Sequence, residues 1–369
     1  MKRLLFFSLI LFCLFGFCCV QPESKESEKS LEEKIIITDL AGRSVEVPKN
    51  VSKVVAIGPG ALRLVVYLQA VDKVVGVENA EKAWEVYTRP YRLANPQLSE
   101  LPTIGVGGTD DPQSNVEELM KLKPDVIFAV VNARYADNLQ EKTGIPVIVI
   151  DYGTLGNFRT TQLFESLRVM GKVLGKEKRA EEVINYIEDI VKDLNSRSKD
   201  AEKPAKVYVG ALGFKGQHGI TSTNCRFPPF EVNNITSENI ACKVNTTAHI
   251  FVDKEFLLRE QPEIIFLDLG NLRLVKEDYS KDKTFYQSLK AFKDGKVYGI
   301  YSFNFYNTNV EQALVNSYWV GKVLYPEKFK DVDVKEKANE IYRFFVGKAI
   351  YEQISSRFGE LGSIDVSSW

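Results

Sequence analysis

Histidine is almost absent from this chain of 369 residues, which contains only His218 and His249. This scarcity argues against a histidine-rich site for a bare transition-metal ion. The chain also lacks a surplus of basic residues, since its formal net charge at pH 7 is -1. Nucleic acid is therefore not an expected partner. The sequence also lacks a nucleophile elbow (GxSxG), a P-loop and an HExxH motif, so it carries no signature of these enzyme classes.

Cysteine is scarce as well, with five residues, of which three fall in an N-terminal apolar run. The other two, Cys225 and Cys242, are close in sequence and fit a single disulfide in an exported protein. Two unrelated buried thiols are the alternative. With only His249 near them in sequence they make a poor metal site, and we predict neither a metal site nor a cofactor.

The N-terminus is typical of an export signal, which we place at residues 1–18. Two basic residues precede the apolar run 4–20. Because this run is at the short limit of what crosses a bilayer, an uncleaved anchor is the alternative. Cys18 and Cys19 end the run and a polar tether, residues 19–34, follows. This order resembles a lipoprotein attachment site, although neither cysteine follows a small residue. Lipidation of Cys18 or Cys19 would hold the chain on the outer face of the cytoplasmic membrane.

Beyond the tether, apolar strands alternate with helical patterns. The expected strands are residues 51–57, 74–77, 126–131, 145–150, 206–209, 264–268 and 297–300. Continuous apolar strands between helices predict an α/β fold with parallel sheets covered on both faces. In such sheets ligands bind at the carboxyl ends of the strands. Here the loops at these ends are rich in Gly, Asn, Tyr and Arg, as expected of a recognition surface. They are residues 58–61, 132–135, 151–155, 210–224, 269–273 and 301–308, and we expect 210–224 to be a long irregular stretch.

Residues 177–197 form the longest helical pattern. Its apolar residues fall on one stripe: Val183, Ile184, Ile187, Ile190, Val191 and Leu194. Neither proline nor glycine interrupts the segment, which would be roughly 30 Å long as a helix. It is either a strut between two α/β halves or an ordinary surface helix of one continuous domain.

Two segments carry a family likeness, residues 115–127 and 252–267. Each contains a short helix, then Pro, an acidic residue and a buried strand. Together with the hairpin 37–48 and the strand–helix unit 51–77, this doubled pattern resembles the substrate-binding proteins of ABC importers for iron chelates, haem and cobalamin. The likeness runs from Ile35 to the end of the chain. It implies two doubly wound lobes, 35–175 and 201–369, joined by one long rigid helix, 176–200.

The resemblance also implies a function. We expect a monomeric lipoprotein, not an enzyme, that binds a small-molecule ligand between its lobes and delivers it to the permease and ATPase of an ABC importer. The expected ligand is an iron chelate, with cobalamin, haem and molybdate or tungstate as alternatives. An exported lipoprotein of the same fold without a transport role is the alternative of another class.

Family members dock onto the permease through an acidic residue on each lobe, and the matching positions are Glu117 and Glu255. Such paired charges steer encounter and fix orientation. The alternative for Glu117 is an acid that complements a helix dipole, and Glu118 beside it competes for the docking role.

Ligand-binding candidates are carried over by position. They are Arg63, Arg134, Tyr135, Tyr152, Phe214, His218, Arg226, His249, Arg273, Phe305 and Tyr306. Arginine offers a planar fork for carboxylate, phosphate or oxyanion groups, and the aromatic rings offer flat surface for a macrocycle or catechol. The alternatives are a solvated surface charge for any arginine, core packing for Tyr306 and a structural hydrogen bond for His249.

Overall fold

The computed structural model describes residues 33–108, 112–246 and 249–369. The export signal, most of the tether and the lipidated cysteine predicted from the sequence lie outside these residues. Residues 33–369 form one compact unit. In the described ranges, no helix combines the length and the apolar character needed to cross a membrane.

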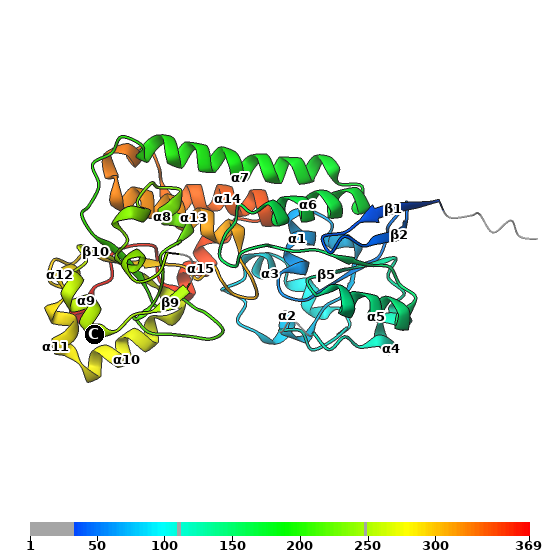
Figure 1. Ribbon diagram of the computed structural model, residues 1–369, viewed down its shortest axis with the longest axis horizontal. Helices are drawn as coiled ribbons and strands as arrows, with labels where there is room; N and C mark the ends of the chain where they lie inside the picture. Colours follow the sequence, from blue (N-terminus) through cyan, green and yellow to red (C-terminus); the bar gives the residue numbers. More distant parts are fainter. Residues whose placement is uncertain (1–32, 109–111, 247–248) are drawn as a thin grey trace, which may run out of the picture. The chain divides into compact units, whose positions relative to one another are not determined.

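The first lobe contains a parallel sheet of four strands in the order β4-β3-β5-β6 (Figure 1). The strands are β3 (Val54–Ile57), β4 (Val74–Gly76), β5 (Val126–Ala129) and β6 (Val147–Val149). Every residue of β3, β5 and β6 is buried, as expected for strands covered on both faces. An antiparallel hairpin, β1 (Lys34–Thr38) and β2 (Ser44–Pro48), precedes the sheet. The helices of the first lobe are α1 (Ala61–Tyr67), α2 (Asn79–Ala83), α3 (Pro90–Ala94), α4 (Val116–Leu122), α5 (Ala133–Thr143) and α6 (Thr161–Leu174).

The second lobe contains a parallel sheet in the order β11-β10-β7. Its strands are β7 (Val207–Gly210), β10 (Ile264–Asp268) and β11 (Val297–Ile300). The helices after β7 are α8 (Pro228–Glu231), α9 (Lys254–Glu260), α10 (Leu272–Lys281), α11 (Lys283–Ser288), α12 (Lys290–Lys293), α13 (Val310–Leu324), α14 (Val334–Val346) and α15 (Tyr351–Phe358). The mixed α/β fold with parallel sheets is the predicted one.

Two features of the second lobe differ from the sequence prediction. A short antiparallel pair forms between β8 (Ser222–Asn224), at the end of the stretch 210–224 that was expected to be irregular, and β9 (His249–Phe251). Helix α10 begins at Leu272, inside a segment expected to be a loop. The apolar residues Leu272, Val275 and Tyr279 recur at helical spacing, so the signal for this helix was present in the sequence.

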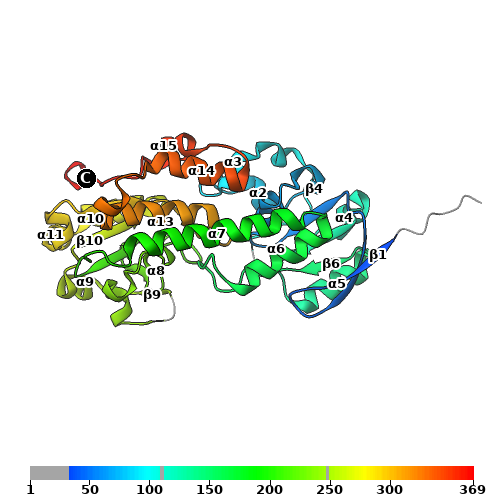
Figure 2. The ribbon, with the colours of Figure 1, turned by 90° about the horizontal axis from the view of Figure 1, so that it is seen from above.

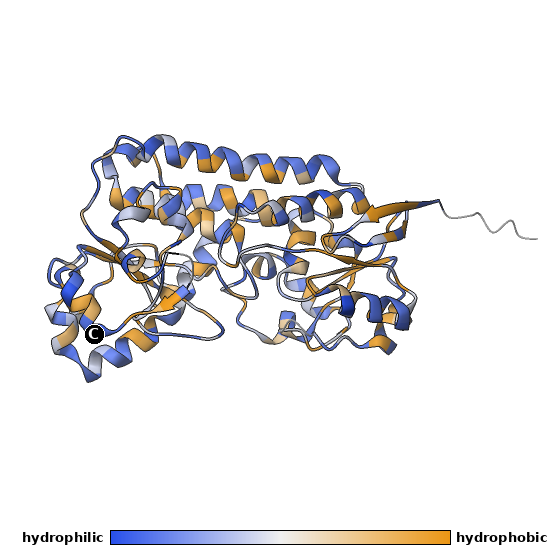
Figure 3. Ribbon diagram, in the orientation of Figure 1, coloured by the Kyte–Doolittle hydropathy of each residue, from blue (hydrophilic) through white to orange (hydrophobic). Residues whose placement is uncertain are grey.

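Helix α7 (Glu177–Ser198) is the long helix that the apolar stripe predicts, and all six stripe residues are buried. It packs against α6 and α13, and Figure 2 shows these three helices side by side. Figure 3 shows apolar colour on the side of α7 that faces its neighbours and polar colour on the opposite side. Helix α14, from the end of the chain, also contacts α1 and α3 of the first lobe. The lobes are therefore connected through packed helices as well as through α7.

Candidate functional site

Arg63 on α1 is the centre of a buried contact between the lobes. Its side chain reaches the loop that follows β11, residues 303–309. Nε donates to Asn309 Oδ1 (3.1 Å), Nη1 to the carbonyl of Thr308 (2.9 Å), and Nη2 to the carbonyls of Phe305 (3.1 Å) and Tyr306 (2.9 Å). The residue is fully buried. Arg63 was expected to bind ligand; in this structure its donors bond to protein acceptors and its side chain is fully buried, so it does not line the cavity described below.

Tyr152 belongs to the same contact. Its hydroxyl donates to the carbonyl of Gly60 (2.8 Å) and accepts a long hydrogen bond from Arg63 (3.4 Å). Burial raises the pKa of Tyr152 to about 12, although the positive charge of Arg63 opposes the rise. The phenol is therefore neutral and 1 % exposed, and Tyr152, which was expected to bind ligand, instead bonds to protein partners.

Tyr306 is the third residue of the contact. It has a left-handed backbone (φ 52°), a conformation that non-glycine residues rarely adopt. Its hydroxyl donates to Glu78 Oε2 (2.5 Å) and accepts from the amide of Gly108 (3.1 Å). Burial raises the pKa of Glu78 to about 7, while the hydrogen bonds from Tyr306 and Gly58 oppose the rise. Tyr306 is 7 % exposed, so core packing, the alternative interpretation, is the one that the structure supports.

A cavity of about 420 Å³ lies between the lobes, beside this contact, because Asn304 of the same loop lines it. The first lobe contributes Thr154, Leu155 and Asn157 from the loop after β6. The second lobe contributes Leu212, Gly213, Phe214, Asn224, Arg226, Glu231, Thr246, His249 and Asn304. The cavity brings together three of the expected ligand residues, Phe214, Arg226 and His249. It is the candidate binding site because both lobes line it and its lining mixes aromatic, amide and hydroxyl groups.

An aromatic wall bounds one side of the cavity. The imidazole of His249 stacks on the ring of Phe214 with 4.3 Å between centroids and 10° between planes. Phe251 packs edge-on against His249 (5.0 Å) and against His218 (4.8 Å), and its side chain is 55 % exposed. Burial lowers the pKa of His249 to about 4, and the charge of His218 adds to this, so the ring is neutral near pH 7. The wall therefore presents flat, uncharged surface.

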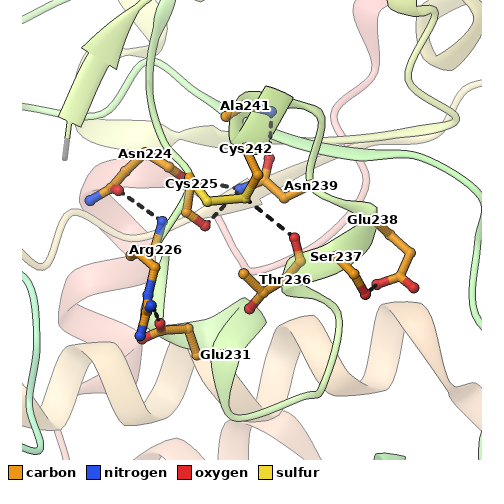
Figure 4. Close-up of a disulfide and its surroundings, with 10 residues drawn as sticks. All are labelled: Asn224, Cys225, Arg226, Glu231, Thr236, Ser237, Glu238, Asn239, Ala241 and Cys242. Atoms are coloured by element: carbon orange, nitrogen blue, oxygen red, sulfur yellow. Dashed lines mark hydrogen bonds and ion pairs between the residues drawn. A yellow bond between two sulfur atoms is a disulfide. The ribbon is translucent and has the colours of Figure 1, made fainter. Parts of the chain in front are cut away.

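Arg226 supplies the one positive charge among the described residues that line the cavity. Its guanidinium forms an ion pair with Glu231, which also lines the cavity, and remains 62 % exposed. The preceding residue, Cys225, is disulfide-bonded to Cys242, as the sequence predicted (Figure 4). Asn224 accepts from the amide of Arg226 (2.9 Å), and Asn239 donates to the carbonyls of Asn224 and Cys225. The disulfide thus anchors the segment that carries Asn224 and Arg226.

The remaining ligand candidates lie away from the cavity lining. Arg134 is exposed on α5, and Tyr135 donates to Ser114 Oγ (2.9 Å). Arg273 is exposed on α10 and pairs with Glu277. Phe305 packs edge-on against Trp84 with 5.8 Å between centroids. For Arg134 and Arg273, which are both exposed, the solvated surface charge is the better interpretation.

Several lining residues were not identified as candidates. Most lie in strand-end loops that the sequence analysis marked as ligand-facing in general, such as Thr154, Gly213 and Asn304. Asn157, Glu231 and Thr246 lie outside those loops, and the sequence carries no local signal for them.

Glu117 and Glu255 are both exposed and lie in the first turns of α4 and α9. Each helix is capped by a side chain, Asn115 on α4 and Asp253 on α9. Within the described ranges neither glutamate forms an ion pair, whereas Glu118 pairs with Lys121. The two lobes thus present matching acidic residues at equivalent helix starts.

Comparison with known proteins gives consistent results. The sequence model of the family described as periplasmic binding protein matches residues 54–302. The molybdate-binding protein MolA of Haemophilus influenzae is 24% identical, with 92% of this chain and 95% of MolA covered. Its molybdate-bound structure superimposes with a TM-score of 0.64 at 22% identity, covering 85% of this chain and 98% of that chain.

Two proteins of Bacillus subtilis are also similar. The ABC transporter substrate-binding lipoprotein YvrC, itself uncharacterized, is 22% identical over 76% of this chain and 82% of its own length. The petrobactin-binding protein YclQ is 23% identical over 80% of this chain and 89% of its own length. The family match covers well over half of the chain and includes both parallel sheets and every residue that lines the cavity except Asn304. The chain therefore belongs to the periplasmic binding protein family.

Proposed function

We propose that this chain is an extracytoplasmic substrate-binding lipoprotein of an ABC importer and that it captures an iron chelate in the cavity between its lobes. The observation that carries the proposal is the cavity of about 420 Å³ with the stacked rings of Phe214 and His249 in its wall, against which Phe251 packs. Flat, uncharged rings favour a planar or aromatic ligand by stacking and by burial of apolar area. Amide and hydroxyl groups elsewhere in the lining suit the oxygen-rich periphery of a chelate.

The charge of the cavity lining favours a chelate over a small oxyanion as the ligand. An oxyanion is held by N–H donors and positive charge. The described lining has one cation, Arg226, and Glu231 already neutralises it. A molybdate or tungstate oxyanion is nevertheless the second candidate, because MolA, a molybdate-binding protein, is similar over nearly its whole length.

The contact around Arg63 supports binding without wide lobe movement. Arg63 joins α1 to the loop after β11 through four hydrogen bonds, and Gly156, beside the cavity, donates to Thr308 Oγ1 (2.8 Å) on that loop. A cavity with walls fixed in this way is pre-formed, which lowers the entropic cost of binding.

Binding can be tested with residues 33–369, which form one compact unit. Thermal shift and intrinsic fluorescence would be measured with ferric siderophores, ferric citrate, haem, cobalamin, molybdate and tungstate. A ligand present at 100 times its Kd should stabilise the protein by about 2.7 kcal/mol. Stabilisation by ferric chelates supports the proposal, whereas stabilisation by oxyanions alone would replace iron with molybdenum or tungsten as the cargo.

Delivery to the permease is the second part of the proposal. Glu117 and Glu255 would contact basic residues of the permease, one on each lobe. Reversal of both charges (Glu117→Arg with Glu255→Arg) should abolish uptake and leave ligand affinity intact. Glu118→Arg tests the neighbouring residue that competes for the docking role, and it should leave uptake unchanged if Glu117 is the docking residue. Loss of affinity in parallel with uptake would contradict docking.

The lipid anchor is the third part. Lipidation of Cys18 or Cys19 would keep the monomer at the outer membrane surface beside its permease. Mass spectrometry of the processed N-terminus in Cys18→Ser and Cys19→Ser variants would identify the attachment site. An unmodified N-terminus in the wild-type chain would contradict the anchor.

A further inference from the structure

Ser222 determines which nitrogen of His249 carries the proton. Ser222 Oγ lies 2.6 Å from the carbonyl oxygen of Leu212 and 2.8 Å from His249 Nε2. A carbonyl oxygen only accepts hydrogen bonds, so the single hydroxyl hydrogen of Ser222 is donated to Leu212. The same Oγ can then only accept from His249, which places a hydrogen on Nε2. Ser222 is fully buried, which keeps water from competing for these bonds.

The other ring nitrogen, Nδ1, is consequently left with a lone pair. A neutral imidazole carries one hydrogen, and because the bond to Ser222 places it on Nε2, Nδ1 carries none. Within the described ranges no side chain or backbone group bonds to Nδ1. The ring lines the cavity and is held against Phe214 by stacking. The cavity wall therefore contains a fixed imidazole with an unused acceptor nitrogen.

A bare metal ion does not suit this nitrogen. The described residues contain no group of three or more His, Cys, Asp and Glu that could hold a metal ion. His218 is the nearest other imidazole, 6.4 Å away between centroids, and it does not line the cavity. With metal–nitrogen bonds of about 2.1 Å, two rings so far apart would reach one ion only from opposite sides. A metal bound here must bring most of its ligands with it.

An oxyanion does not suit the nitrogen either. Its oxygen atoms present lone pairs, which the lone pair of Nδ1 repels, and this position offers no N–H group to the cavity. A metal centre inside a chelate with an open coordination position is the partner that accepts a lone pair and needs only one protein ligand.

We propose that Ser222 is a positioning residue that fixes the Nε2–H tautomer of His249, so that Nδ1 ligates the metal of a chelate at an open coordination position. The inference rests on the proposed function, and it narrows the substrate class to coordinatively unsaturated chelates. Partners of metal-ligating histidines typically contribute 10- to 100-fold in metal affinity.

Two nickel chelates test the inference on residues 33–369. Nickel nitrilotriacetate leaves coordination positions open, whereas nickel EDTA fills them. Calorimetry should detect binding of the first and no binding of the second. His249→Gln should abolish binding of nickel nitrilotriacetate, and His218→Gln should leave it unchanged. Ser222→Ala should weaken it about 10-fold or more, and Ser222→Thr, which keeps a hydroxyl, should restore it.

Nitrogen-15 NMR of histidine-labelled protein gives a readout that a purely structural role would not change. The wild-type chain should show His249 as the Nε2–H tautomer, and Ser222→Ala should shift the ring towards a mixture of tautomers. An Nδ1–H tautomer in the wild type would overturn the inference, as would equal affinities of the wild type and Ser222→Ala.

The inference and the proposed function fail in different ways. A ferric chelate that binds equally well to the wild type and to His249→Gln would overturn the inference and leave the proposed function intact. Failure of every chelate to bind the wild type would overturn both.

Discussion

The contact between the lobes has two sides that use similar residues in opposite ways. On one side Arg63, Tyr152 and Tyr306 are buried, and their polar groups are bonded to protein partners. On the cavity side Arg226 is exposed apart from one ion pair, and His249 keeps a nitrogen free of described partners. Burial of a polar group is tolerated only when it is hydrogen-bonded, whereas a group that binds ligand must keep bonding capacity. The first side holds the lobes together, and the second remains available to a ligand.

The largest expected effect is on the buried side. Arg63→Ala removes five hydrogen bonds and leaves the carbonyls of Phe305, Tyr306 and Thr308 without this donor. We expect a loss of about 3–5 kcal/mol in the free energy of unfolding, measured by urea denaturation. Arg226→Ala is the matched control and should cost below about 1 kcal/mol, because exposed ion pairs contribute little. Similar losses for the two variants would contradict the distinction between the two sides.

Removal of the disulfide should destabilise the protein and leave the segment with Asn224 and Arg226 less firmly positioned at the cavity. Cys225 and Cys242 are separated by 17 positions, and closing a loop of this size stabilises a protein by about 3 kcal/mol in the chain-entropy description. The variant with both cysteines changed to Ser should unfold at lower urea concentration than the wild type. It should also bind ligand more weakly, because the disulfide anchors Asn224 and Arg226. Unchanged affinity would show that hydrogen bonds alone position this segment.

Glu78 should make the stability of the buried contact around Arg63 and Tyr306 depend on pH. Its pKa is raised from 4.5 to about 7, so the folded chain binds the proton more tightly than the unfolded chain. The stability this provides is complete below pH 4.5 and is lost as pH rises towards about 7. Glu78→Gln removes this dependence. As pH rises from 4.5 to about 7, the wild type should therefore lose up to about 3 kcal/mol of unfolding free energy relative to the variant.

Tyr306→Phe sharpens the same test. It removes the hydrogen bond that favours the charged form of Glu78, so the window should move to higher pH. Urea denaturation at several pH values checks both variants. Curves for the wild type and Glu78→Gln that remain parallel across the whole range would contradict the role of Glu78.

The smallest expected effect is that of Phe214→Ala on the cavity side. Loss of the ring stacked on His249 should cost about 1 kcal/mol of ligand affinity, roughly a fivefold change in Kd. Stability should change little, because Phe214 is partly exposed at the cavity wall. Titration of the ligand identified in the binding panel measures this, with Phe305→Ala as the control outside the cavity lining.

Local patterns gave the secondary structure of most of the chain. The stripe of α7, the doubled helix–Pro–acid–strand segments and the apolar strands are properties of short stretches, so the sequence predicted them and the two-lobe family. The pair β8 and β9 was missed because its strands are short and their pairing depends on segments 25 or more residues apart. Apolar periodicity carries no information about such contacts.

The sequence by itself determined which loops collect at the carboxyl ends of the strands and that Arg, Tyr and His lie in them. Only the tertiary structure decided which of these side chains are buried and which face the cavity. Arg63 and Arg226 are equivalent in composition and differ in environment, because one meets the carbonyls of a loop more than 240 positions away and the other meets solvent. The role of each residue depends on burial and on the partners that distant segments bring to it, and neither is encoded in the residue's own neighbourhood.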